Sequence, residues 1–242
     1  MIESLLLAVT RIATVSEGTE KTNATGFFFE RDDRLFLVTA RHVVKDEATN
    51  HRPDSLLIDL HSNPGNVAQV TRFFIPLYSN GKPVWREGLD SAGDVDVAVV
   101  ELDRSALPAT LLSKPFTPAH LVQQLDAVEA GSPIVIVGFP LGFQDMLHHL
   151  PVARQGIIST SFGLRFQGMG YFLTDARTHR GASGAPVVAR TASSQSGRED
   201  LPWMLLGIHT SRMDVINRDG EGDGRLNLNT AWYADIILTL TD

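Results

Sequence analysis

The sequence predicts an all-β fold, and two observations support that prediction. Most apolar runs are short, rich in β-branched or aromatic residues, and end at turn-forming residues, which is typical of strands. The runs follow one another without long helical stretches between them, which indicates a barrel or a sandwich. With 242 residues, 43% of them hydrophobic, the chain can form one sizeable unit or two smaller ones that share an interface.

The expected strands fall into two sets along the chain. The apolar run at 4–9 predicts a first strand. The runs at 26–30 and 35–40 predict a hairpin closed by Arg31-Asp32-Asp33-Arg34. The other strands of the first set are expected at 55–60, 67–75 and 97–102. The second set is expected at 134–138, 156–160, 171–175, 186–189 and 204–210.

Two short helices are expected outside the strands. Thr117-Pro118 predicts a helix that runs through Leu125, because threonine caps a helix and proline suits its first turn. Its apolar face would be formed by Leu121, Val122 and Leu125. A second helix is expected at the C-terminus, capped by Asn229. Its apolar residues recur at helical spacing: Trp232, Ile236, Ile237 and Leu240.

The strand sets and helices divide the chain into three parts. We expect an N-terminal unit over 1–110, a connector over 111–130 and a C-terminal unit over 131–242. The segments 190–201 and 212–225 are rich in polar residues and glycine, so we expect both to be mobile loops.

Composition limits the classes of partner and the cellular location. The chain has 21 basic and 28 acidic residues, a formal net charge of -7, which argues against a nucleic acid or an anionic membrane as partner. There is no cysteine, so no disulfide can stabilise the fold. The apolar run at 4–9 follows an acidic Glu3 and is too short for a signal peptide. No run is long enough to span a membrane, and a cytoplasmic location is therefore expected.

The most informative motif is Gly181-Ala182-Ser183-Gly184-Ala185-Pro186. It resembles the nucleophile loop of chymotrypsin-fold serine peptidases. An α/β-hydrolase elbow is rejected, because it requires Gly-x-Ser-x-Gly leading into a helix, whereas Ala185 replaces the second glycine here. A polar serine in a glycine-containing turn is the alternative without catalysis.

Two upstream motifs extend the resemblance. The run 35–44 resembles the strand that leads to the family's histidine, which is His42, and 94–100 resembles its aspartate segment, with Asp96 in the aspartate position. The order His42, Asp96, Ser183 is that of chymotrypsin. Asp94 is a local rival for Asp96 because both would face the same side of a strand, and His42 as a core histidine is the alternative to a base.

The resemblance covers about 26–211 and is strongest to the HtrA/DegP-like and glutamyl-endopeptidase branches. It implies two six-stranded antiparallel barrels with a short C-terminal helix and an active site between them. It also implies a serine endopeptidase that acts on polypeptides without a cofactor or metal. His42 would be the general base, Asp96 would orient it, and the N–H groups of Gly181 and Ser183 would bind the oxyanion.

Specificity residues follow from the glutamyl-endopeptidase branch alone. In that branch a histidine within Gly-Ile-His and a threonine five residues before the serine recognise an acidic side chain. This chain has His209 and Thr178 at those positions, and Arg177 adds positive charge. Thr210 and Ser211 complete the expected substrate-binding set. In the alternative, His209 packs in the core and the pocket takes small apolar residues.

Two departures from the family pattern support a second class of function. Ala182 replaces the Asp or Asn that usually precedes the nucleophile and braces its loop, and Arg212 stands where a substrate-facing glycine is common. The alternative is therefore a catalytically silent or partner-activated peptidase-like module that binds a protein or peptide. A regulatory protein would then be a partner. The sequence indicates no oligomeric state.

Overall fold

The structure is a computed structural model that describes residues 2–191, 200–213 and 226–242. Most of the two expected loops, 190–201 and 212–225, lies outside the described residues.

The first part of the chain forms a seven-stranded antiparallel sheet. Its strand order is β5-β4-β1-β2-β3-β9-β8, so β5 and β8 lie at its edges. Its strands are β1 (Val9–Ser16), β2 (Thr19–Arg31), β3 (Arg34–Thr39), β4 (Ser55–His61), β5 (Val70–Pro76), β8 (Trp85–Asp90) and β9 (Gly93–Leu102). A small separate hairpin joins β6 (Tyr78–Ser79) to β7 (Lys82–Pro83).

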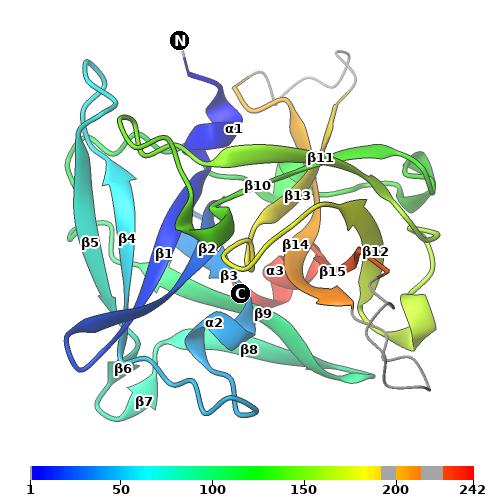
Figure 1. Ribbon diagram of the computed structural model, residues 1–242, viewed down its shortest axis with the longest axis horizontal. Coiled ribbons are helices and arrows are strands. Elements are labelled where there is room, and N and C mark those ends of the chain that lie inside the picture. Colours follow the sequence, from blue (N-terminus) through cyan, green and yellow to red (C-terminus); the bar gives the residue numbers. More distant parts are fainter. Residues whose placement is uncertain (1, 192–199, 214–225) are drawn as a thin grey trace.

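The second part forms a closed six-stranded barrel, in the order β10-β11-β12-β15-β14-β13. Its strands are β10 (Pro133–Gly138), β11 (Val152–Ile158), β12 (Tyr171–Ala176), β13 (Pro186–Arg190), β14 (Trp203–Met213) and β15 (Leu228–Tyr233). A short helix, α3 (Ile236–Leu240), follows the last strand. The all-β prediction and the short C-terminal helix are both confirmed. The sheet and the barrel lie side by side, with α3 near the middle of the molecule (Figure 1).

The hairpin between β2 and β3 confirms the turn expected at 31–34. Arg31 pairs with Arg34, which leaves Asp32 and Asp33 as a two-residue turn. Their φ angles are 50° and 58°, as in the type I′ turn that suits the twist of a hairpin. The turn places β3 antiparallel to β2, and the end of β3 leads into the segment that carries His42.

The expected first strand is wrong over its first residues. Ser4–Leu7 forms one helical turn, α1, and the strand begins only at Val9. A short apolar run fits a strand or a buried helical turn equally well, and tertiary contacts decide between them. Here Leu5 is buried in the core, and the carbonyl of Ala8 accepts a hydrogen bond from Phe28 N–H.

The expected helix at 117–125 is also wrong. The chain forms two 3₁₀ turns instead, Pro118–His120 and Leu125–Ala127. Thr117 N–H donates to Nδ1 of His120, which caps the start of the first turn, and the turn ends because Leu121 is extended and pairs with Leu205 of β14. Leu121 is buried, whereas Leu125 is 51% exposed, so they share no apolar face.

The C-terminal helix is shorter than its apolar pattern indicates. Trp232 belongs to β15, and Asp235 occupies the cap position. Asn229 is not a cap. It is buried in β15, where its side-chain amide donates to the carbonyls of Thr174 and Ala176.

One core cluster joins the two parts of the chain. It contains Phe27 and Val97 from the sheet, Val137 and Ile208 from the barrel, and Ile237 from α3. Arginines of the sheet also hold the end of the chain, which follows the barrel: Arg31 donates to Leu238 O, Arg34 to Thr241 O and Arg86 to Leu240 O. The sheet and the barrel therefore form one packed body.

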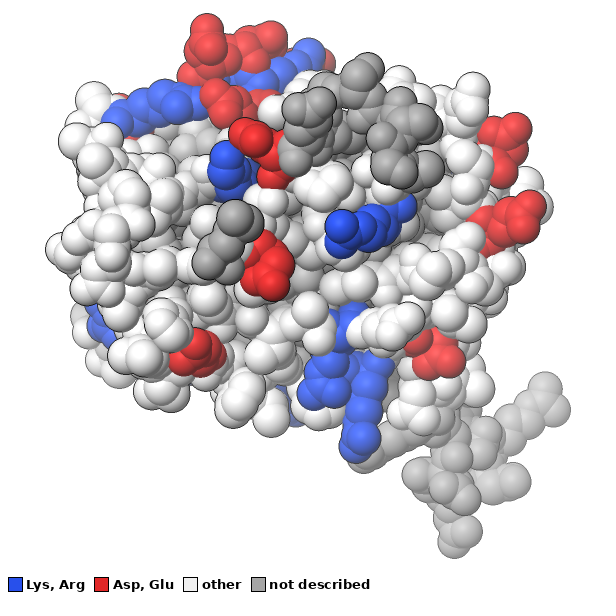
Figure 2. All heavy atoms as spheres, turned by 90° about the horizontal axis from the view of Figure 1, so that it is seen from above, with Lys and Arg blue, Asp and Glu red and all other residues white. Residues whose placement is uncertain are grey.

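The surface carries both signs of charge. On the face in Figure 2, Lys and Arg side chains lie among Asp and Glu, and uncharged residues cover most of the area. Among the described helices, none is long and apolar enough to cross a membrane.

Candidate active site

His42 lies on a one-turn helix at the end of β3. The strand ends at Thr39, Ala40 caps the turn, and α2 spans Arg41–Val44. Val43 and Val44 are buried against the sheet, whereas the side chain of His42 keeps 36% of its surface exposed. The apolar residues thus anchor the turn and leave the imidazole accessible.

Asp96 lies on β9 and holds His42 through three contacts. Nδ1 of His42 lies 2.9 Å from Oδ2 and 3.1 Å from Oδ1 of Asp96, and the backbone N–H of His42 donates to Oδ1 at 3.0 Å. A carboxylate only accepts hydrogen bonds, so Nδ1 carries the proton. In the neutral imidazole, Nε2 is then the free acceptor.

The surroundings of His42 raise its pKa above the usual value. Burial lowers the pKa, but the hydrogen bond from Nδ1 to Asp96 and the charge of Asp96 outweigh that effect, and Asp46 adds to them. Arg41 acts in the opposite direction because its positive charge disfavours the imidazolium.

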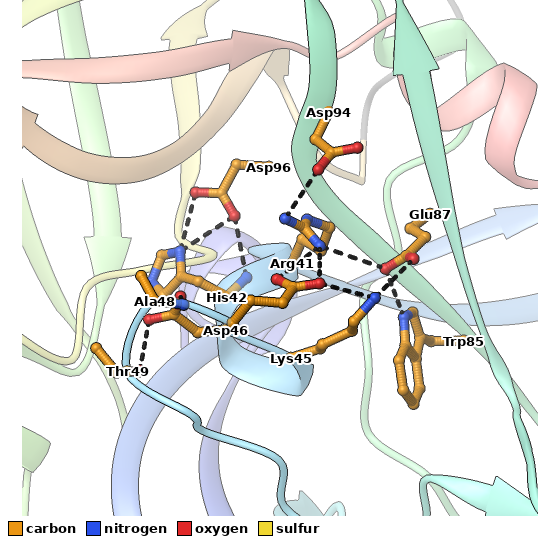
Figure 3. Close-up of polar contacts among 11 residues, drawn as sticks. Arg41, His42, Lys45, Asp46, Ala48, Thr49, Trp85, Glu87, Asp94 and Asp96 are labelled. Carbon is orange, nitrogen blue, oxygen red and sulfur yellow. Dashed lines mark hydrogen bonds and ion pairs between the residues drawn. The ribbon is translucent and has the colours of Figure 1, made fainter.

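The rival aspartate has a different partner. Asp94 contacts Arg41, with Oδ2 3.3 Å from Nη2. Figure 3 shows the two aspartates reaching two consecutive residues of α2: Asp96 reaches His42 and Asp94 reaches Arg41. The structure therefore places Asp96, and not Asp94, against the imidazole.

The loop that carries Ser183 packs against the segment before His42. Thr25 N–H donates to the carbonyl of Ser183 at 2.9 Å. Gly184 has a φ of +87°, and a Cβ there would lie 2.1 Å from Thr25 O and 3.0 Å from the nitrogen of Ala40, the cap residue of α2. Only glycine allows this approach.

The hydroxyl of Ser183 points to Thr210. Its Oγ donates to Thr210 O at 3.0 Å. Ser183 and His42 both lie in the described part of the chain, and no hydrogen bond joins them there. The structure thus brings His42 and Asp96 into contact. It packs the Ser183 loop against Thr25 and Ala40, and the Ser183 hydroxyl bonds to Thr210 O.

The loop that carries Ser183 presents two backbone N–H groups, those of Gly181 and Ser183. Leu141 N–H donates to Arg180 O at 2.5 Å. In a trans peptide the carbonyl and the next N–H point in opposite directions, so the N–H of Gly181 points away from Leu141. Among the described residues, neither the N–H of Gly181 nor that of Ser183 has an acceptor. The buried hydroxyl of Thr25 links this loop to Phe139: Oγ1 donates to Gly181 O and accepts from Phe139 N–H.

The expected specificity residues lie on β14 and on the segment before Ser183. Thr178 is buried, and its hydroxyl donates to Oδ1 of Asn229 at 2.6 Å. Thr210 is also buried, Ser211 is exposed, and the hydroxyls of both lie within hydrogen-bonding distance of Thr230 Oγ1. Arg177 is exposed.

His209 is almost completely buried, with 2% of its surface exposed. Within the described ranges of the chain, its Nδ1 has no hydrogen-bond partner. Burial, together with the positive charges of His42 and Arg212, lowers its pKa to about 4. His209 is therefore neutral at neutral pH and lies close enough to His42 to sense its charge.

Sequence reasoning missed three polar residues around the site. Thr25 braces the Ser183 loop, Asn229 binds Thr178, and Thr230 contacts Thr210 and Ser211. Thr25 is 156 residues from Gly181, and no local pattern indicates such a pairing.

A cavity of about 580 Å³ lies elsewhere, where the connector and α3 meet the barrel. Leu121, Trp232 and Ile236 contribute to its wall, and none of the expected site residues lines it. Val95, on the opposite side of β9 from Asp94 and Asp96, reaches it.

The fold resembles those of solved bacterial proteases. The serine endoprotease of Yersinia pestis matches with a TM-score of 0.55 and 18% identity, over 98% of this chain and 62% of that chain. The Rv3671c protease of M. tuberculosis in its active form matches with a TM-score of 0.51 and 18% identity, over 98% of this chain and 80% of that one. An HtrA-type protease with a bound decapeptide matches with a TM-score of 0.53 and 16% identity, over 97% of this chain and 62% of that chain.

The chain spans less than two thirds of the Yersinia protein, and identities this low establish a chymotrypsin-like fold alone. A comparison with curated proteins found no match. The sequence model of the trypsin-like peptidase domain matches residues 24–193, which is well over half of the chain. The chain therefore belongs to the trypsin-like peptidase domain family.

Proposed function

We propose that the chain is a serine endopeptidase in which Ser183 attacks the peptide carbonyl while His42 takes the serine proton. The contact of His42 with Asp96 carries this proposal, because it leaves Nε2 free to act as the base. A serine hydroxyl is a poor nucleophile at neutral pH and needs such a base. Asp96 stabilises the imidazolium that forms, and His42 then returns the proton to the leaving amine.

The N–H groups of Gly181 and Ser183 bind the oxyanion of the tetrahedral intermediate. Neither N–H has an acceptor among the described residues, which supports this role, as does the bond from Leu141 N–H that fixes the orientation of the 180–181 peptide. The loss of one such donor typically costs about 3 kcal/mol of transition-state stabilisation. Water then hydrolyses the acyl-enzyme on Ser183.

The orientation of the Ser183 hydroxyl favours a second candidate, a peptidase activated by its substrate or by a protein partner. The hydroxyl donates its proton to Thr210 O, so this hydrogen bond must break before Nε2 of His42 can take the proton. A bound peptide that competes for Thr210 O would release it. Without such release, the chain would bind peptides and leave them intact.

A fluorophosphonate probe tests the proposal. We expect the parent protein to be modified at Ser183, as located by mass spectrometry, and the Ser183→Ala variant to remain unmodified. Modification that appears only after addition of an unfolded protein would identify the activated form. Equal lack of reaction in both proteins, with and without unfolded protein or cell extract, would contradict peptidase activity.

We further propose that the site prefers an acidic residue before the cut bond. Three exposed arginines, Arg177, Arg180 and Arg212, lie on the two segments that carry Ser183 and His209. Within the described residues, none of the three has an ion-pair partner. Their positive potential supports attraction of an acidic peptide. His209 itself is neutral, so it would offer a hydrogen bond and not a charge.

Matched peptides test this preference. Peptides with Glu before the cut bond should have a higher kcat/KM than the same peptides with Gln. Arg212→Gln should reduce that difference, whereas Arg104→Gln, which removes an arginine paired with Glu30 on the sheet, should leave it unchanged. Equal kcat/KM for Glu and Gln peptides in the parent protein would contradict the proposed preference.

A further inference from the structure

The helix that carries His42 is too short to be stable by itself. α2 has four residues, its cap residue Ala40 makes no side-chain hydrogen bond, and no acidic residue lies in its first turn. An isolated helical turn of this length is unstable in water. The position of the imidazole therefore depends on contacts between α2 and its neighbours.

Arg41 makes three ion pairs with these neighbours. Its guanidinium lies 3.3 Å from Asp94 on β9, 3.9 Å from Glu87 on β8 and 3.4 Å from Glu47, which follows α2. The side chain is only 16% exposed. A guanidinium presents several donors in one plane, so it can hold three carboxylates in a fixed arrangement.

Lys45 and Trp85 in turn hold two of the carboxylates that contact Arg41. Lys45 lies 2.9 Å from Glu47 and 3.6 Å from Glu87, and the indole N–H of Trp85 donates to Glu87. The hydrogen bond from Lys45 lowers the pKa of Glu47 to about 2, so this carboxylate stays charged at neutral pH. Figure 3 shows the network reaching from α2 to β8 and β9.

The network gives α2 a second attachment to β9. Asp96 and Asp94 face the same side of the strand, about 6–7 Å apart along it. Asp96 holds His42, and Asp94 holds the residue before it. Val43 and Val44 anchor the buried side of the turn, and the two aspartates fix its exposed side, which carries the imidazole.

We propose that Arg41 is a positioning residue, which fixes α2 to Asp94 and Glu87 so that His42 stays in register with Asp96. This inference rests on the proposed role of His42 as the general base. Arg41 does not touch the reacting atoms, so its loss should act through the imidazole.

A pH profile distinguishes this role from general stabilisation. The groups that face His42 are Asp96 from β9, Asp46 and Arg41 from its own segment, and His209 from β14. Asp96 and Asp46 favour the imidazolium, and Arg41 opposes it. Loss of the Arg41 charge alone should therefore raise the pKa of His42, whereas loss of register with Asp96 should lower it, because the hydrogen bond to Asp96 favours the imidazolium. Arg41→Lys keeps the charge and removes the planar set of donors, so it isolates the positioning role. We expect Arg41→Lys to lower the pKa of His42 and to move the acidic limb of the reaction to lower pH.

The experiment compares Arg41→Gln with Arg41→Lys, Asp94→Asn and the control Arg104→Gln. We expect Arg41→Gln to lower the maximal rate of fluorophosphonate labelling by about tenfold, since small misplacements of a catalytic group have effects of this size or larger. Arg41→Lys should fall between the parent and Arg41→Gln, because an ammonium cannot hold three carboxylates at once. The double variant with Asp94→Asn should be no slower than the slower single variant.

A second measurement does not depend on activity. The pKa of His42 is followed by NMR in Ser183→Ala protein, and its signal is assigned with His42→Gln. We expect a lower pKa with Arg41→Lys than with Arg104→Gln, because lysine keeps the positive charge and only the register of His42 with Asp96 is lost. If the parent protein fails to label while this difference appears, the peptidase function fails and the positioning role stands. If Arg41→Gln does not fold, Arg41→Lys and Asp94→Asn provide the same comparison. Labelling rates and a His42 pKa equal to those of Arg104→Gln would overturn the inference.

Discussion

Substitution of Gly184 by alanine tests how closely the Ser183 loop is fitted to the sheet. The residue has a φ of +87°, and a Cβ there would lie 2.1 Å from Thr25 O and 2.3 Å from Oγ1 of Thr39. Both distances are far below van der Waals contact, and Thr25 O belongs to the backbone of β2. Either the loop or the strand must move, and Ser183 moves with the loop.

The expected loss of stability follows from two contributions. An L-residue in the left-handed region costs about 1–2 kcal/mol. Overpacking in a close-packed interior adds about 1–3 kcal/mol. We therefore expect Gly184→Ala to lower the free energy of unfolding by about 2–5 kcal/mol.

Gly131→Ala is the matched control. Gly131 has a φ of +90°, but a Cβ there would meet no atom within 4 Å. This variant should show only the backbone contribution, about 1–2 kcal/mol. Urea unfolding measures both free energies, and fluorophosphonate labelling under native conditions should fall sharply for Gly184→Ala alone. Equal destabilisation by the two substitutions, with equal labelling, would refute the close fit of the loop.

Three further predictions concern the polar groups of the site. The rate of fluorophosphonate labelling should rise with pH and reach half its maximum above pH 6.5. Only the neutral imidazole of His42 accepts the serine proton, and Asp96 raises the pKa of His42. A midpoint below pH 6.5 would contradict this expectation. The pKa of His209 is about 4 in the folded protein, against 6.5 in the unfolded chain. Between these pH values the unfolded state binds more protons than the folded state. The free energy of unfolding therefore falls as the pH drops from 6.5 towards 4. His209→Leu should remove about 2 kcal/mol of the difference in unfolding free energy between pH 7 and pH 5, and an unchanged difference would show that His209 titrates normally. Thr25→Val should leave Gly181 O and Phe139 N–H without their partner and destabilise the fold by about 1–3 kcal/mol in urea unfolding, whereas no loss would mean that another donor replaces the hydroxyl.

The sequence predicts those parts of the fold in which neighbouring residues determine the structure. The turn at Asp32 and Asp33 is one example, because aspartate tolerates positive φ and the flanking runs have strand character. The chain order of the three motifs likewise predicted a chymotrypsin-like fold, since several local patterns in one order are far more specific than each alone.

Other features depend on contacts between distant residues and could not be predicted from the sequence. The helical pattern after Thr117 ends early because Leu121 takes an extended conformation and pairs with Leu205 of β14. The choice between Asp94 and Asp96 depends on which of them reaches Arg41 and which reaches His42, and strand periodicity treats both alike. The hydroxyl of Ser183 has an acceptor, Thr210 O, 27 residues away, and its rotamer is a tertiary property.

The core cluster shared by sheet and barrel has a consequence for biosynthesis. Val97 neighbours Asp96 in the first part of the chain, Ile208 lies in the second, and both belong to that cluster. On a ribosome, the stretch bearing the imidazole and its carboxylate emerges well before the stretch bearing the serine. A nascent polypeptide thus cannot bring His42, Asp96 and Ser183 together until its later portion docks on the earlier one.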